Sequence, residues 1–179
     1  HDSRHGCGRP NSPVRFRISG RWSRASRIRA TFGQWVAMWR VPIPKPADGF
    51  YRVRTFGRER AMSDRILQFI AEGQKTVTFV LPATYTGDRN ATPVVGGYSV
   101  VTDLAGVPRF VLRTTAIKTV PYAEVSAQDS QYEGPGVRTL EEWRRVHWDF
   151  FTASLKPLGK TPSEDMPVTV ERFEVVCKP

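Results

Sequence analysis

Apolar and polar residues recur along the chain with two different periods, and the change of period predicts where helices and strands lie. Between Ser63 and Gly73 the apolar residues recur at helical spacing and form one face of an amphipathic helix. Ser63 is a residue type that favours the N-cap of a helix, and Gly73 favours the position after its last residue. The apolar face consists of Ile66, Leu67, Phe69 and Ile70.

Strict alternation follows directly after Gly73 and predicts a strand over residues 75–81. Thr139 and Glu142 form a capping box, which predicts the start of a second long helix. Strands and helices in this mixed order indicate an α+β fold. Further strands are predicted at residues 98–102, 109–118 and 168–176, and short helical turns at residues 121–134. The first strand should place Thr76, Thr78 and Val80 on one face and Val77, Phe79 and Leu81 on the other.

The distribution of charge separates an N-terminal extension from the folded domain. The chain has 179 residues and a formal net charge of +10, and residues 1–50 contain ten basic but two acidic residues. These residues are rich in Arg, Ser and Gly and end in a Pro-containing linker, so they are predicted to form a disordered or loosely docked extension. The domain is expected at residues 51–179. A phosphate-binding arm and an organellar targeting segment are alternatives for the extension.

The composition excludes several classes of protein. No apolar run approaches the roughly 20 residues that a membrane-spanning helix needs. Cys7 and Cys177 lie at opposite ends of the chain and are no disulfide framework, which favours a reducing, cytoplasmic environment. His1 and His5 lie near Cys7 without a fourth ligand, so we expect no metal site and no cofactor.

The strand over residues 75–81 carries the most informative chemistry of the chain. A Thr hydroxyl becomes a nucleophile only when a base removes its proton, and a Lys can be that base if burial lowers its pKa. Lys75 and Thr78 are spaced so that both can point into one pocket. The segment is not a phosphate-binding P-loop, because the Gly-Lys pair is absent and the helix precedes the motif. An ordinary strand with a solvated Lys75 is the alternative.

Two further segments supply candidate residues. Glu133 lies in a glycine-containing loop, where a carboxylate can act as general acid or base or simply be solvated. His147 lies on the apolar face of the second helix, where a hydrogen-bonded core histidine is the alternative to a functional one. Arg144 on the same face must reach a pocket, a carboxylate or solvent. The face consists of Leu140, Trp143, Arg144, His147, Phe150 and Phe151.

Taken together, these segments resemble the ASCH domain family, which belongs to the PUA-like folds. The resemblance covers about residues 54–176, and the order and spacing of its motifs agree. It implies a small β-barrel with helices packed around it and a cleft facing the strand that carries Lys75 and Thr78. The motifs are Thr55-Phe56-Gly57, Gly73-Gln74-Lys75-Thr76-Val77-Thr78, Glu133-Gly134, residues 140–148, residues 163–167 and residues 171–176.

The resemblance implies that the protein binds RNA or a nucleotide-like, modified nucleoside ligand in a cleft around Lys75. Phe56 would stack a base, and Lys75 and Arg144 would meet a phosphate or a carbonyl. Thr76 and His147 complete the expected ligand-binding set. The sequence does not indicate an oligomeric state.

A hydrolase is the alternative function, because some family members cleave single-stranded RNA and a smaller branch hydrolyses N4-acetylcytidine. In that branch a Lys, a Thr three residues later and a Glu are catalytic, and the motif match places these roles on Lys75, Thr78 and Glu133. The branch carries an Arg where this chain has Val80, and many members carry an acidic residue where it has Gly97. An interaction module without catalysis is a third hypothesis.

Overall fold

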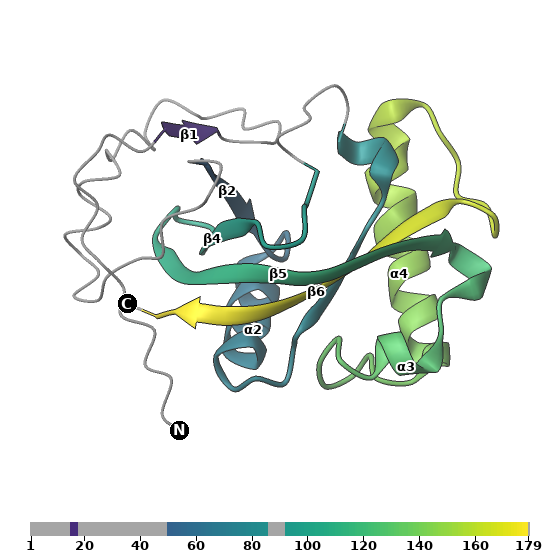
Figure 1. Cartoon of the computed structure of the whole chain (residues 1–179). Helices are drawn as coiled ribbons and strands as arrows, with labels where there is room; N and C mark the ends of the chain where they lie inside the picture. The colour runs from purple at the N-terminus through teal and green to yellow at the C-terminus, as the bar shows by residue number, and fades with distance from the viewer. Residues whose placement is uncertain (1–14, 18–49, 86–91, 179) are drawn as a thin grey trace.

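The computed structural model describes residues 15–17, 50–85 and 92–178, which form a curled, mixed sheet with helices packed against it (Figure 1). The order of the strands across the sheet is β1-β2-β4-β5-β6-β3. β2 runs parallel to both of its neighbours, whereas the remaining pairs are antiparallel. The strands are β1 (Arg15–Arg17), β2 (Phe50–Thr55), β3 (Val77–Val80), β4 (Tyr98–Thr102), β5 (Pro108–Pro121) and β6 (Pro167–Cys177).

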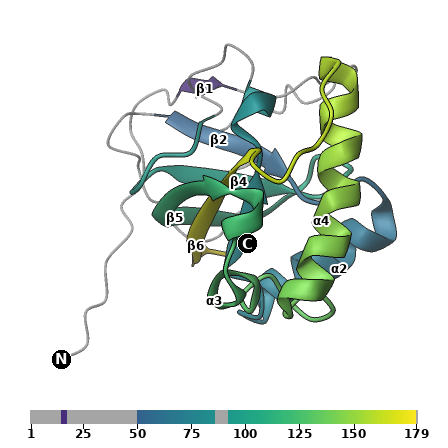
Figure 2. The same cartoon turned by 90° about the vertical axis from the view of Figure 1, so that its right-hand side faces the viewer.

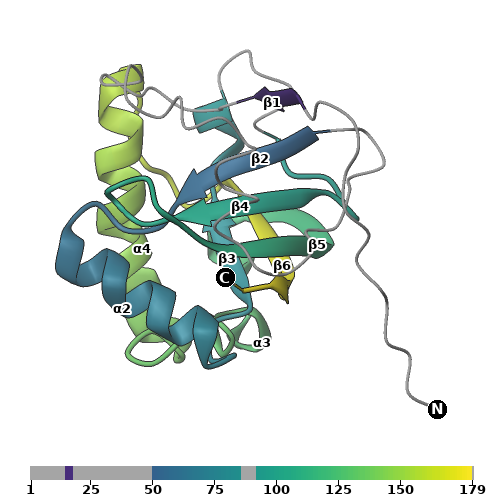
Figure 3. The same ribbon diagram turned by 90° about the vertical axis from the view of Figure 1, so that its left-hand side faces the viewer.

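Three α-helices of the described residues lie beside this sheet. α4 stands along one side of the sheet, and α2 passes below β4 and β5 close to one end of α4 (Figures 2 and 3). The sheet curls into a half-barrel, which confirms the expected α+β, PUA-like barrel with helices around it. The helices are α2 (Arg60–Ala71), α3 (Ala127–Ser130) and α4 (Leu140–Leu155), with 3-10 turns η1 (Pro82–Tyr85), η2 (Tyr122–Glu124) and η3 (Lys156–Leu158).

Two apolar clusters hold the helices on the sheet. The larger one lies between α4 and the β3–β6 pair, and it buries Trp143 and Phe151 of α4 completely. Val77, Phe79 and Leu81 belong to this cluster, which confirms the predicted apolar face of the strand. The second cluster joins α2 to the middle of the sheet and contains Leu67, Ile70, Val101, Phe110, Leu112 and Phe173.

The end of α2 sets the position of Lys75. Gly73 has φ +72°, and the amides of Gly73 and Gln74 donate to the carbonyls of Ile70 and Phe69 at 3.1 and 2.8 Å. This is the Schellman arrangement, and it confirms Gly73 as the residue that ends the helix. The amide of Lys75 also donates to the Phe69 carbonyl, at 3.1 Å, so the chain leaves the helix in one fixed direction.

Several expected boundaries need correction. α2 begins at Arg60 with Glu59 as its N-cap, so Ser63 is a buried residue inside the helix rather than its cap. β3 begins at Val77 instead of Lys75, because the Lys75 amide is used by the helix end and the Thr76 amide donates to the Tyr132 carbonyl. β5 and β6 extend beyond their expected ends. The capping box of Thr139 and Glu142 is present at the start of α4.

The predicted N-terminal extension lies outside the described residues, except for Arg15–Arg17 and Phe50. Arg15–Arg17 form β1 and pair in parallel with Phe50–Arg52 of β2. The residues His1, His5 and Cys7 also lie outside the described part of the chain.

Two glycines with positive φ offer a matched test of this fold. A Cβ on Gly73 would meet no atom within 4 Å, whereas a Cβ on Gly57 (φ +78°) would lie 2.8 Å from the backbone nitrogen of Ser63 in α2. We expect Gly73→Ala to lower the free energy of unfolding by about 1–2 kcal/mol, through backbone strain alone. Gly57→Ala should cost clearly more, because α2 must also shift. Urea unfolding measures both, and an equal loss would contradict the packing of the β2–α2 turn.

Candidate functional site

Lys75 and Glu133 form a buried ion pair at the entrance to β3. The Lys75 side chain is 3% exposed, and its Nζ lies 2.6 Å from Oε2 of Glu133. Nζ donates a hydrogen bond to the Val77 carbonyl at 2.8 Å and a longer one to the Glu133 carbonyl at 3.5 Å. Oε2 of Glu133 receives no well-aligned hydrogen bond from the described residues, so its contact with Nζ is mainly electrostatic. The ammonium therefore lies against the peptide that joins Val77 to Thr78.

His147 of α4 completes a cluster of three titratable groups. Its Nε2 lies 3.5 Å from Oε1 of Glu133, and its Nδ1 lies 3.1 Å from the Trp143 carbonyl oxygen. A carbonyl only accepts, so Nδ1 must carry a hydrogen, and Nε2 carries one as well only in the imidazolium form. The His147 ring stacks on the Trp143 ring at a centroid distance of 4.5 Å. We call Lys75, Glu133 and His147 the buried trio.

Burial and charge shift the two partners of the ion pair in the same direction. Burial lowers the pKa of Lys75 from its usual 10.5, although the negative charge of Glu133 opposes this effect. For Glu133, burial favours the neutral acid, but the charge of Lys75 and the contact with His147 outweigh it and lower the pKa below 4.5. Glu133 is therefore ionised at neutral pH, and Lys75 gives up its proton more easily than a solvated lysine.

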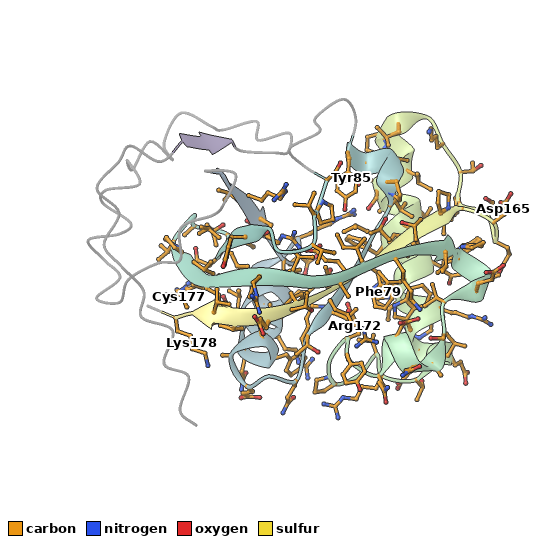
Figure 4. All side chains as sticks on the ribbon, in the orientation of Figure 1. Phe79, Tyr85, Asp165, Arg172, Cys177 and Lys178 are labelled. Atoms are coloured by element: carbon orange, nitrogen blue, oxygen red, sulfur yellow. The ribbon has the colours of Figure 1, made fainter. Side chains whose placement is uncertain are left out.

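An open cleft of about 450 Å³ lies next to the buried trio. Thr78 stands on its wall, and it pairs in register with Glu171 of β6, so the two side chains lie on the same face of the sheet. Tyr85 of η1 also lines the cleft, and Figure 4 shows it at η1, with Phe79 near the sheet side of α4. The lining residues come from the end of β2 and the following turn (residues 53–58), β3 (Thr78, Phe79, Val80), η1 (Thr84, Tyr85), α4 (Phe150) and β6 (Glu171).

A second charged pair forms the floor of this cleft. Arg54 of β2 makes two hydrogen bonds to the Glu171 carboxylate, at 2.9 and 3.1 Å, and Thr114 of β5 donates a third at 2.7 Å. Glu171 is 1% exposed. Burial and the negative charge of Glu171 raise the pKa of Tyr85, although Arg54 opposes this, so the phenol stays protonated. The pair fixes β2 against β6 across the curled sheet.

Aromatic rings separate the cleft from the buried trio. The Lys75 Nζ lies 5.7 Å from the centroid of Phe56, and the His147 ring lies edge-on to Phe79 and Phe150 at 5.2 and 6.4 Å. All three phenylalanines line the cleft. A ligand in the cleft would therefore touch the rings that cover the trio.

The structure thus brings together some of the predicted residues. Lys75, Glu133 and His147 form one cluster, and Phe56 and Thr78 line the cleft beside it. Thr76 contributes its backbone: its amide and carbonyl bond to Tyr132 and Phe173. Arg144 is exposed and donates to the Ala123 carbonyl at 3.1 Å, away from the cluster and the cleft lining.

Most of the other residues that line the cleft were not predicted as site residues, among them Arg54, Arg58, Tyr85, Phe150 and Glu171. Arg54 and Glu171 are 117 positions apart in the chain. Each lies in a strand that carries other charged residues, Arg52 in β2 and Arg172 and Glu174 in β6, so the sequence does not mark Arg54 and Glu171 as a buried pair. Phe150 belongs to the predicted apolar face of α4, yet the residue is 42% exposed.

The comparisons with known proteins decide the family. The family model for the ASCH domain matches residues 52–177. The chain belongs to the ASCH domain family. The crystal structure of an ASCH domain from Lactobacillus crispatus JV V101 has a TM-score of 0.68 and 24% identity to it, and the match covers 82% of this chain and 91% of that one.

A second solved structure is also similar to this chain. A protein from Enterococcus faecalis V583 is 31% identical, with a TM-score of 0.64, over 70% of this chain and 76% of that one. No curated protein matches the chain. Among the described residues of this ASCH domain, no helix is long and apolar enough to cross a bilayer, and no group of three His, Cys, Asp or Glu side chains is placed to hold a metal ion.

We expect the buried ion pair of Lys75 and Glu133 to contribute more to the free energy of unfolding than an exposed ion pair does. Glu133→Gln leaves the Lys75 ammonium buried without a counter-charge, and we expect a loss of about 3–5 kcal/mol in the free energy of unfolding. The matched control is Glu174→Gln, which breaks a pair with Arg113 whose partners are both 46% exposed, and it should cost about 1 kcal/mol or less. Similar losses in the two variants would contradict the importance of the buried pair.

The effect of Glu133→Gln on the free energy of unfolding should depend on pH. The folded-state pKa of Glu133 lies below 4.5, so its ionisation stabilises the fold above that value, and this stabilisation disappears as the pH falls through the lowered pKa. The gap in stability between the wild type and Glu133→Gln should therefore narrow below pH 4.5. Urea titrations at several pH values measure the gap, and a constant gap would show that Glu133 is not held ionised.

Proposed function

We propose that this ASCH domain binds a nucleotide-like or modified nucleoside ligand, free or within RNA, in the cleft between β2, β3, η1 and α4. The observation that supports this most directly is a buried lysine–glutamate pair behind the aromatic wall of an open cleft. Such a pair is often no more stabilising than apolar residues of the same size. Titratable groups with shifted pKa values beside a cleft are typical of functional sites.

The cleft has the size and the chemistry for a base and its sugar. About 450 Å³ lies within the range of small-molecule sites, roughly 300–1,000 Å³. Phe56 and Phe150 offer ring faces on which a base can stack. Thr78 has no side-chain hydrogen bond to another residue in the described part of the chain, so its hydroxyl is available to a ligand as donor and as acceptor.

Binding can be measured with the full chain and a panel of ribonucleosides, N4-acetylcytidine and short single-stranded RNAs. We expect Phe150→Ala to weaken binding about tenfold or more, because base stacking on an aromatic ring contributes about 1–3 kcal/mol. Thr78→Val should weaken it several-fold by removing a hydrogen bond of about 1 kcal/mol. Lys75→Met should also weaken it, because the trio behind the Phe56 ring would lose its cation.

The control for these titrations is Leu158→Ala in η3, which truncates an exposed apolar residue outside the cleft lining. Its affinity should match the wild type. Equal affinity in Leu158→Ala, Phe150→Ala and Lys75→Met would place the ligand elsewhere and refute the proposed site.

A hydrolase acting on the same class of ligand is the second candidate. It is favoured by the lowered pKa of Lys75 and by the position of its Nζ against the peptide that leads to Thr78. Lys75 would first pass its ammonium proton to Glu133, whose Oε2 lies 2.6 Å from Nζ. Thr78 Oγ would then attack the acyl carbonyl while the neutral Lys75 takes the hydroxyl proton, and Glu133 would give its proton to the leaving amine. Water would then hydrolyse the acyl-threonine ester.

Incubation with N4-acetylcytidine tests this reaction by the release of cytidine and acetate, and labelled single-stranded RNA tests cleavage. Thr78→Ala and Lys75→Met should each lower turnover at least about a hundredfold, because nucleophile and base are both lost. Thr115→Ala, at an exposed position of β5, is the matched control and should retain full activity. Turnover that survives in both site variants would exclude this mechanism.

A further inference from the structure

Among the described residues around the cleft, one cation has no carboxylate partner. Arg54 is paired with Glu171, and Lys75 is paired with Glu133. Arg58 also lines the cleft, and no carboxylate among the described residues pairs with it. Its guanidinium donates to the Ser154 hydroxyl at 2.9 Å. In the described part of the cleft, Arg58 therefore carries a positive charge that no carboxylate neutralises and that a ligand can contact.

Arg58 is held at the mouth of the cleft. It lies in the turn between β2 and α2, and its guanidinium carbon lies 5.0 Å from the centre of the Phe150 ring on α4. Both side chains are exposed, so a ligand can reach them from solvent. A guanidinium has five N–H donors in a planar fork, and Ser154 occupies one of them. The remaining donors suit the oxygens of a phosphate group.

We propose that the cleft selects phosphorylated nucleosides, with Arg58 binding the phosphate at the mouth while the base lies inside against Phe56 or Phe150. This inference rests on the proposed function and narrows its ligand class to a nucleoside phosphate ester, as a mononucleotide or as part of RNA. It also replaces Arg144 as the expected phosphate contact, because Arg144 bonds to the Ala123 carbonyl outside the cleft lining. Lys75 remains paired with Glu133 and lies against the Phe56 ring, at the end of the cleft where the base would bind.

The experiment compares each nucleoside with its own phosphate ester on the full chain. The panel consists of the four ribonucleosides and N4-acetylcytidine, each also as the 5′-monophosphate, together with dinucleotides and inorganic phosphate alone. In the wild type the 5′-monophosphate of a bound nucleoside should bind about ten- to a hundredfold more tightly, as expected for charge-assisted hydrogen bonds. Added salt should reduce this gain.

Variants of Arg58 test whether its guanidinium causes the tighter binding of the monophosphate. In Arg58→Gln, a nucleoside and its own monophosphate should bind with nearly equal affinity, whereas Arg58→Lys should keep part of the preference for the monophosphate as a point charge. Arg145→Gln is the matched control, because it removes an exposed arginine of α4 outside the cleft lining. Its affinities for the nucleoside and for the monophosphate should match those of the wild type. Urea unfolding of each variant checks that the fold is intact.

The outcomes separate this inference from the proposed function. A nucleoside and its monophosphate that bind equally, or a gain that persists in Arg58→Gln, would overturn the role of Arg58 and leave nucleoside binding in place. Dinucleotides that bind more tightly than monophosphates would identify RNA as the source of the phosphate. If no member of the panel binds in either form, the proposed function is wrong and the role of Arg58 falls with it.

Discussion

Burial of the Lys75 ammonium against the Glu133 carboxylate is the constraint around which the site is arranged. Removing two charges from water is costly, and the cost is offset only if the geometry is held firmly. Two local structures hold it here. The Schellman turn after α2 directs the chain at Lys75, and the bond from the Thr76 amide to the Tyr132 carbonyl fixes the loop that carries Glu133. His147 then packs against both the carboxylate and the cleft wall, so α4 is tied to the same point.

Two ion pairs lie at or beside the cleft in the described residues, and they differ in what surrounds them. Arg54 and Glu171 join strands across the sheet, and with Thr114 they form a floor whose hydrogen bonds are well aligned. Lys75 and Glu133 join the segment between α2 and β3 to a loop, and one carboxylate oxygen lacks an aligned hydrogen bond. The first pair therefore resembles a structural brace. The second pair has fewer aligned hydrogen bonds to its carboxylate, and its members contact rings that line the cleft.

The sequence predicted the local features of this site better than its assembly. Gly73 and the Thr139–Glu142 capping box are short-range signals with a direct backbone cause, and both are confirmed. The Ser63 prediction failed because the N-cap lies four residues earlier, at Glu59, after the tight turn at Gly57. Helical spacing placed Arg144 on the apolar face of α4. Its long side chain nevertheless reaches solvent and bonds to the Ala123 carbonyl at the edge of that face. Arg58 and Phe150 meet through a contact between two elements, which no periodicity encodes.

The hydrogen bonds of Lys75 indicate which of the two candidate functions, binding or catalysis, the structure supports better. Acceptors surround its Nζ: the Val77 carbonyl, the Glu133 carbonyl and the Glu133 carboxylate. This environment suits the ammonium, which only donates, whereas a base must present a lone pair to Thr78. Catalysis therefore requires Lys75 first to transfer a proton to Glu133, which the short Nζ–Oε2 contact permits but the lowered pKa of Glu133 opposes. Binding requires no such step, so the resting arrangement favours recognition, and a reaction would depend on a substrate that changes the balance between these two groups.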